Sequence, residues 1–170
     1  MTRVARIEPA AFRHVLGHLA TGVTVITAKH DEYGPVGMSC NSTASVSLDP
    51  PLISFCPAKS STTWPAIRAT GGFCVNVMAS HHEDTTRGFA ARDVDRFAAV
   101  TWRDRPCGPA LEGAVAWIDC EIHAEHDAGD HVIVLGRVVA LDAVREGLPL
   151  VFFRGRYGTF TKRDPAACAG

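Results

Sequence analysis

The 170-residue chain lacks an excess of charge of one sign, since 17 basic and 18 acidic side chains give a formal net charge of -1. This balance argues against non-specific binding to nucleic acid or to an anionic membrane, which needs a one-signed surface field, although it allows a local basic patch. No apolar run approaches the roughly 18 residues that span a bilayer, and Met1 to Arg13 contains no apolar core of a signal peptide. We therefore expect a soluble cytoplasmic protein with neither a membrane nor a nucleic-acid partner.

Several catalytic and metal-binding motifs are also missing. The six cysteines form no CxxC pair, which excludes a zinc knuckle and a thioredoxin-type motif. Neither GxGxxG after a strand, nor a P-loop, nor a GxSxG nucleophile elbow occurs. Cys56 and Cys74 lie in apolar runs, so we expect buried, reduced thiols. No metal site is predicted, because the adjacent His81 and His82 should diverge on a helix.

The composition, with 46% hydrophobic and 21% charged residues, fits one globular domain with ample core. Strands are predicted over residues 23–28, 36–41, 44–48, 52–56, 73–78, 116–125, 131–144 and 148–153. Most follow one another through short turns, which favours an antiparallel sheet closed into a barrel over a doubly wound parallel sheet. We predict a mainly β domain with a few helices over residues 1–163 and a disordered tail over 164–170.

Two amphipathic patterns make finer predictions. Apolar side chains recur at helical spacing in one segment, at Phe12, Val15, Leu16 and Leu19, and this helix should cover part of a core with its apolar stripe. In the strand over 116–125, apolar and polar residues alternate, which places Asp119 on a solvated face. A further segment, residues 80–91, has helical composition.

Small hydroxyl and amide side chains fill residues 37–47, where the flanking sequence indicates sheet. Small side chains expose backbone N–H groups, which can hydrogen-bond the edge of a flat heteroaromatic ligand. A polar turn with cross-strand Ser/Thr pairs explains the same composition, and composition alone favours that second interpretation.

Three other motifs each have two interpretations. Lys59 and the hydroxyl residues 60–63 can hold a phosphate at a helix N-terminus, or can simply cap a short helix over 64–67. His131 follows a Gly-Asp turn, either as a solvated strand residue or as an imidazole at a pocket rim. Residues 154–158, with two arginines and a tyrosine, can hold an anionic nucleotide or form an exposed arm at an interface.

These motifs occur together in one order along the chain. They lie at residues 12–13, 21–27, 41–42, 45–52, 60, 62, 73–77, 89–90, 95–97, 129–133 and 154–157. In that order they resemble the flavin reductase family, the FMN-binding split-barrel proteins that reduce flavin for two-component monooxygenases. The resemblance covers nearly everything from Phe12 to Phe160.

The resemblance implies a homodimeric split β-barrel that binds FMN or FAD near the subunit interface and takes NADH or NADPH as hydride donor. It implies flavin-ring contacts at Ser39, Cys40, Asn41, Ser42, Ala44, Ser45, Phe89 and Ala90. It implies phosphate contacts at Ser60, Ser61 and Thr62. His131 would be the catalytic residue over the nicotinamide, and Arg154, Gly155 and Tyr157 would seat the pyridine nucleotide.

The implied activity is an NAD(P)H:flavin oxidoreductase that supplies reduced flavin to a partner flavin-dependent monooxygenase. The alternative is a non-enzymatic flavin carrier or redox sensor on the same fold, which His131 and Arg154 disfavour because a carrier needs no nicotinamide seat. The chain departs from the family pattern at Thr43, where relatives usually have Phe, and at Thr85, where they usually have Leu. These departures put stacking on the flavin ring and the fit of the helix around Thr86 in question.

Overall fold

The structure, a computed structural model, describes residues 7–144 and 146–161. Its elements in chain order are α1 (Pro9–Leu16), β1 (Thr21–Gly22), β2 (Thr24–His30), β3 (Gly34–Cys40), β4 (Ala44–Leu48), β5 (Pro51–Phe55), α2 (Trp64–Ala69), β6 (Gly72–Val77), α3 (Glu83–Ala90), β7 (Trp102–Arg103), β8 (Ala110–Leu111), β9 (Ala116–Ala128), β10 (His131–Ala143), β11 (Leu150–Phe153) and β12 (Arg156–Thr159). The predicted mainly β architecture with few helices is confirmed. The predicted tail over 164–170 lies outside the described residues, where Cys168 also falls. In the described ranges, no helix is long and apolar enough to cross a membrane.

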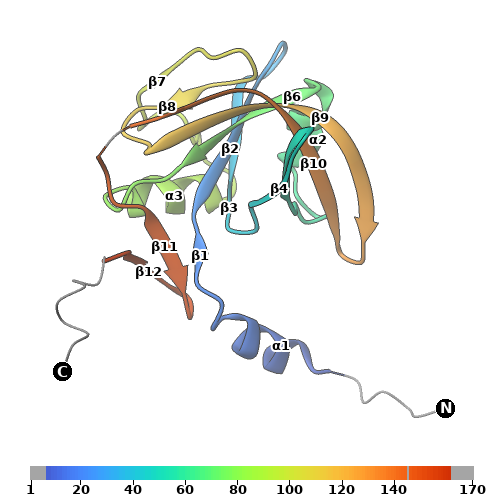
Figure 1. Cartoon of the computed structure of the whole chain (residues 1–170), viewed down its shortest axis with the longest axis vertical. Helices are drawn as coiled ribbons and strands as arrows, with labels where there is room; N and C mark the ends of the chain where they lie inside the picture. The colour runs from blue at the N-terminus through green and yellow to red at the C-terminus, as the bar shows by residue number, and fades with distance from the viewer. Residues whose placement is uncertain (1–6, 145, 162–170) are drawn as a thin grey trace.

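Seven antiparallel strands form the main sheet, in the order β3-β2-β6-β9-β10-β5-β4 (Figure 1). The predicted hairpin of β2 and β3 is present, and β9 pairs with β10 along a long hairpin that turns at residues 129–130. A second sheet has the order β1-β11-β12. Its strand β12 was not predicted. Arg154 and Gly155 make a tight turn with positive φ angles of 51° and 77°, whereas the sequence analysis interpreted residues 154–158 as either a nucleotide-binding segment or an exposed arm.

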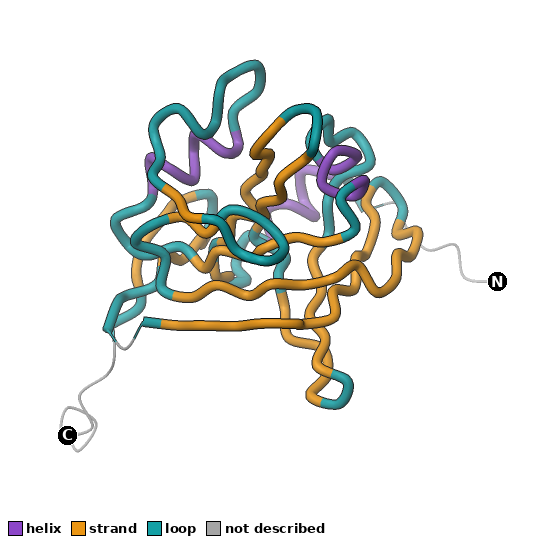
Figure 2. The backbone as a smooth tube through the Cα atoms, turned by 90° about the horizontal axis from the view of Figure 1, so that it is seen from above, coloured by secondary structure: helices purple, strands orange, loops and turns teal. Residues whose placement is uncertain are grey.

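The main sheet curls around one core. Buried side chains from both ends of the strand order meet there, with Cys40 of β3, Phe55 of β5 and Phe73 of β6 in a single cluster. Trp64 and Ile67 of α2 complete that cluster, so α2 covers part of the interior. In the view of Figure 2, the helical segments lie away from the long strands along the lower edge. The edge strands β3 and β4 stand at opposite ends of this order and do not pair with each other. Within the described residues, backbone hydrogen bonds therefore do not close the sheet into the predicted barrel.

Helix α1 forms within the predicted segment but ends at Leu16, before Leu19, and it does not cover the core of its own chain. None of its residues is buried, and the four predicted stripe residues are 41–63% exposed. Figure 1 shows α1 below the sheet, away from the curled strands. The expectation that this stripe covers a core is therefore wrong for the single chain.

Asp119 also differs from the sequence analysis. Its side chain is fully buried, not solvated, because the loop that carries β7 and β8 covers this face of β9. Arg105 donates a hydrogen bond of 2.7 Å to its carboxylate, and the backbone N–H of Cys107 donates another of 3.2 Å. Asn76 of β6 holds the same loop, since its amide donates to Pro109 O and accepts from the Leu111 N–H.

Candidate functional site

A cleft of about 180 Å³ lies where β3 ends beside α3 and the second sheet. Its lining residues are Val23, Ser39, Cys40, Asn41, Thr86, Phe152 and Tyr157. The structure thus brings together Ser39, Cys40, Asn41 and Tyr157, which were predicted as site residues from distant parts of the sequence. It adds Val23, Thr86 and Phe152, which the sequence analysis missed.

The connection from β3 to β4 is held by its own small side chains. Ser42 Oγ accepts a hydrogen bond of 2.9 Å from the Cys56 N–H and lies 3.1 Å from Cys40 Sγ. Thr43 Oγ1 lies 2.8 Å from Thr24 Oγ1. Thr43 therefore serves as a polar anchor for the loop, and the loop holds Asn41 at the mouth of the cleft.

Tyr157 forms one wall of the cleft and is fixed from two sides. The Arg87 guanidinium lies over its ring, with 4.9 Å between Cζ and the ring centre, and Phe152 packs edge-on at 5.2 Å. Glu83, one turn earlier on α3, accepts a hydrogen bond of 2.7 Å from Arg87. Helix α3 and the second sheet are thus joined through a cation–π contact beside the cleft.

Thr86 of α3 lines the same cleft. Its side chain is 1% exposed, and its Oγ1 has no hydrogen-bond partner. The sequence offered only a weak indication of this position, since Thr86 shares the inner face of the helix with Phe89 three residues later. A threonine adds nothing to an apolar stripe, so a pattern of apolar residues could not mark it.

The loop before α2 and the turn before β10 make a second group of predicted residues. Ser61 Oγ accepts hydrogen bonds from the N–H groups of Thr63 and Trp64, which confirms the capping interpretation for Ser61. Lys59 Nζ pairs with Asp127 at 2.7 Å, so its charge is already matched by a carboxylate. Ser60 and Thr62 are exposed.

His131 lies directly beside that loop. It forms an isolated antiparallel bridge with Ala58, and the Lys59 N–H donates a hydrogen bond of 2.9 Å to Asp130 O. His131 Nδ1 lies 2.7 Å from a carboxylate oxygen of Asp130, and this hydrogen bond lowers the pKa of Asp130. The ionised carboxylate favours a proton on Nδ1, which leaves Nε2 as a hydrogen-bond acceptor.

These two groups belong to one region of the molecule. Ser61 Oγ and Met38 Sδ, 4.0 Å apart, link the loop before α2 to β3, and Ser42 links the β3–β4 connection to the end of β5. In the view of Figure 1 the β3–β4 connection lies between the β11–β12 hairpin and the β9–β10 turn. Side-chain contacts therefore tie β3 and the β3–β4 connection to the segment over residues 56–61.

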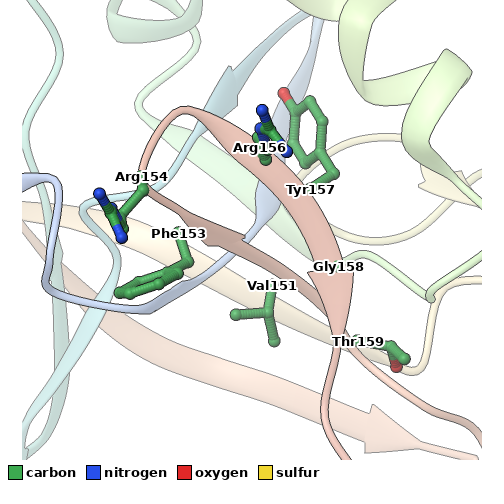
Figure 3. Close-up of a pocket in the computed structure, with 7 residues that line it drawn as sticks. All are labelled: Val151, Phe153, Arg154, Arg156, Tyr157, Gly158 and Thr159. Atoms are coloured by element: carbon green, nitrogen blue, oxygen red, sulfur yellow. The ribbon is translucent and has the colours of Figure 1, made fainter.

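The hairpin of β11 and β12 carries the predicted nucleotide residues on an open surface. A hollow of about 610 Å³ is lined only by residues 151–159 of this hairpin, and Figure 3 shows Arg154 near the turn and Arg156 beside Tyr157. Arg154 N–H donates a hydrogen bond of 2.8 Å to Gly17 O, which ties the turn to the end of α1. Tyr157 lines both this hollow and the cleft.

Five predicted flavin contacts lie outside the cleft lining, namely Ser42, Ala44, Ser45, Phe89 and Ala90. Phe89 is 1% exposed and packs in the core with Val25 and Met78, while Ala90 at the end of α3 is exposed. Ala44 and Ser45 are exposed on β4, which lies at the edge of the sheet.

His81 and His82 do not diverge, contrary to the sequence analysis. Both precede α3 in a turn, and their ring centres lie 4.1 Å apart. Across the described ranges, no group of three His, Cys, Asp or Glu side chains gathers as a metal site.

Comparison with known families gives the context for this geometry. Residues 16–161 match the family described as flavin reductase like domain. The chain belongs to this family. The resemblance inferred from the sequence motifs is thereby confirmed.

Several relatives of this flavin reductase chain are similar over nearly its whole length. It is 49% identical to the reductase subunit HsaB of a flavin-dependent monooxygenase from Rhodococcus jostii, over 89% of this chain and 77% of that protein. It is 44% identical to a flavin reductase from Pseudomonas putida, over 94% of this chain and 98% of that protein. Among solved structures, nitrilotriacetate monooxygenase component B from Mycobacterium thermoresistibile superposes with a TM-score of 0.87 and 45% identity, covering 92% of this chain and 89% of that chain.

A further similar structure contains bound ligands. The NADH:FAD oxidoreductase SgcE6 of Streptomyces globisporus, in complex with NAD and FAD fragments, superposes with a TM-score of 0.85 and 35% identity. The match covers 93% of this chain and 98% of that chain.

Proposed function

We propose that this protein is an NAD(P)H:flavin oxidoreductase that transfers hydride to FMN or FAD and supplies reduced flavin to a partner monooxygenase. The observation that carries the proposal is the cleft in which Ser39, Cys40 and Asn41 face Thr86 and Tyr157. The names of its relatives support the same activity, among them a 42% identical FMN reductase (NADH) from Agrobacterium fabrum.

The residues of the cleft fit a flavin ring. Short side chains at the end of β3 let a flat ring approach the backbone, and Val23 and Phe152 offer apolar surface beside them. The unpartnered Thr86 hydroxyl is a buried polar group that a ring with polar edges would satisfy. Ser60 and Thr62, exposed before α2, would hold the phosphate end.

When bound, the flavin supplies the redox chemistry, accepting hydride at N5 from the reduced nicotinamide. The chain supplies orientation, which can contribute about 7–11 kcal/mol in well-aligned systems. Asp130 would hold His131 in one tautomer after the β9–β10 turn, so that Nε2 can position the nicotinamide that donates hydride. Arg154 and Tyr157 would seat the negatively charged nucleotide.

We infer a homodimer on a split barrel from the incompleteness of the single chain. A cleft of about 180 Å³ is smaller than the roughly 300–1,000 Å³ of an ordinary ligand pocket, so a further wall is needed. The exposed stripe of α1, together with Val46 and Leu48 on the edge strand β4, offers apolar surface for a second copy. Sedimentation velocity should give a dimer, and Leu19→Glu should shift it toward monomer. A monomeric wild-type protein that still binds flavin would contradict the homodimer.

The activity is tested by mixing the protein anaerobically with FMN or FAD and with NADH or NADPH. Loss of the oxidised flavin absorbance at a rate proportional to protein concentration is expected, and the four combinations reveal flavin and donor preference. Flavin binding without bleaching would instead favour the carrier or sensor. We expect the reaction in the cytoplasm, in keeping with five described cysteines that are all free.

A further inference from the structure

The hydroxyl of Thr86 is anomalous for a buried threonine on a helix. Such a hydroxyl commonly donates to the carbonyl three or four residues earlier in its own helix. Here His82 O accepts the Thr86 N–H at 2.9 Å, while Oγ1 has no partner. In the described part of the chain, Thr21 is the other residue with a buried, unpartnered side-chain oxygen.

The cleft around Thr86 specifies what this hydroxyl can meet. Val23 and Phe152 give it apolar walls, and the end of β3 faces it across the opening. Cys40 Sγ is already engaged with Ser42 Oγ, so it does not compete for the same partner. A flat ring between the apolar walls would therefore present its rim to Thr86.

We propose that Thr86 is a binding residue whose Oγ1–H donates a hydrogen bond to a carbonyl oxygen carried on the aromatic ring held in this cleft. The inference rests on the proposed function, which supplies two such rings. The isoalloxazine has carbonyls on its pyrimidine edge, and the nicotinamide has a carboxamide. In both cases the Thr86 hydroxyl has no partner in the apo protein, and a carbonyl oxygen of the ligand would supply the missing hydrogen-bond acceptor.

The test uses Thr86→Val, which keeps the shape and removes the hydroxyl, beside Thr86→Ser, which keeps the hydroxyl. The dissociation constants of FMN and FAD are measured by fluorescence titration, the KM for NADH by steady-state kinetics, and the apo melting temperature by calorimetry. We expect Thr86→Val to weaken one ligand roughly three- to tenfold, as the loss of one hydrogen bond does, and Thr86→Ser to restore it within about twofold. A rise in the flavin dissociation constant assigns the contact to the isoalloxazine, and a rise confined to the KM for NADH assigns it to the nicotinamide.

The apo melting temperature separates a ligand contact from a structural one. Because the hydroxyl has no internal partner, Thr86→Val should leave the apo protein at least as stable as wild type, whereas a residue that holds the fold would lose stability. Thr21→Val is the matched control, since it removes the other unpartnered hydroxyl outside the cleft lining and should leave both ligand constants unchanged.

Two results would overturn the assignment of Thr86. One is Thr86→Val with wild-type constants for both ligands, and the other is a variant that loses apo stability while binding normally. If wild-type protein neither binds nor bleaches flavin, the proposed function itself fails, and the Thr86 contact fails with it. If the wild-type protein bleaches flavin but Thr86→Val leaves both ligand constants unchanged, only the proposed Thr86 contact is wrong.

Discussion

The Arg87 guanidinium lies over the ring of Tyr157, with Cζ 4.9 Å from the ring centre. Tyr157 is a wall of both the cleft and the hairpin hollow, while Arg87 lines neither. Arg87 is held in turn by Glu83 at 2.7 Å. The position of one wall of the site is therefore set from α3 by a residue that need not touch a ligand.

Arg87→Met should raise the KM for NADH about two- to fivefold with little change in kcat, because an exposed cation–π contact contributes about 0.5–1 kcal/mol. Steady-state kinetics at varied NADH concentration measures both KM and kcat. Arg92→Met, an exposed arginine just beyond the same helix, is the control and should match wild type. A fall in kcat at unchanged KM would show that Arg87 acts in another way.

Asp130→Asn tests the partner of His131. The hydrogen bond from His131 lowers the pKa of Asp130, so the carboxylate is ionised across the neutral range and holds the proton on Nδ1. Asparagine removes that charge, and we expect kcat/KM for NADH to fall about threefold, with a larger fall for His131→Ala. Asp127→Asn, which loses the exposed pair with Lys59, is the control. Wild-type values of KM and kcat in His131→Ala would remove His131 from the site.

Arg96→Met tests how the loops around the site are held together. Arg96 donates to Gly37 O at 2.8 Å, to Ala91 O at 2.7 Å and to Thr63 Oγ1, so it joins β3, the end of α3 and the start of α2. Losing these charged hydrogen bonds should cost about 2–4 kcal/mol in the free energy of unfolding, measured by urea denaturation. Arg68→Met, which loses an exposed pair with Glu125, should cost under about 1 kcal/mol. Equal costs for the two variants would contradict this role of Arg96.

The strands could be predicted because alternation and turn residues are local properties of the chain. The strand over 116–125 was found in this way, and it is part of β9. Asp119 within it was misplaced, because its burial depends on a loop folded over from elsewhere, which alternation does not record.

The candidate site was harder to predict than the fold. The small residues at the end of β3 and Tyr157 were associated only by family resemblance, since no local pattern relates positions so far apart. Thr86 was missed because a polar residue facing inward looks like an interruption of a helix stripe. The apolar stripe of α1 was recognised, but a sequence pattern does not say whether such a stripe packs on its own chain or on another.

The cysteine thiols give a last prediction. Burial, with a smaller contribution from the nearby Asp119 carboxylate, raises the pKa of Cys74 to about 12, and burial also raises the pKa of Cys107 and of Cys120. Only the thiolate attacks a disulfide reagent, and at pH 8 a pKa of about 12 leaves roughly one Cys74 in ten thousand ionised. Among the described cysteines of the native protein, a chromogenic aromatic disulfide should therefore modify the half-buried Cys56 first and leave Cys74 and Cys120 unmodified, and peptide mass spectrometry assigns each site. Denaturant should release all the thiols at once, and fast native labelling of Cys74 would show that the loop over Asp119 opens.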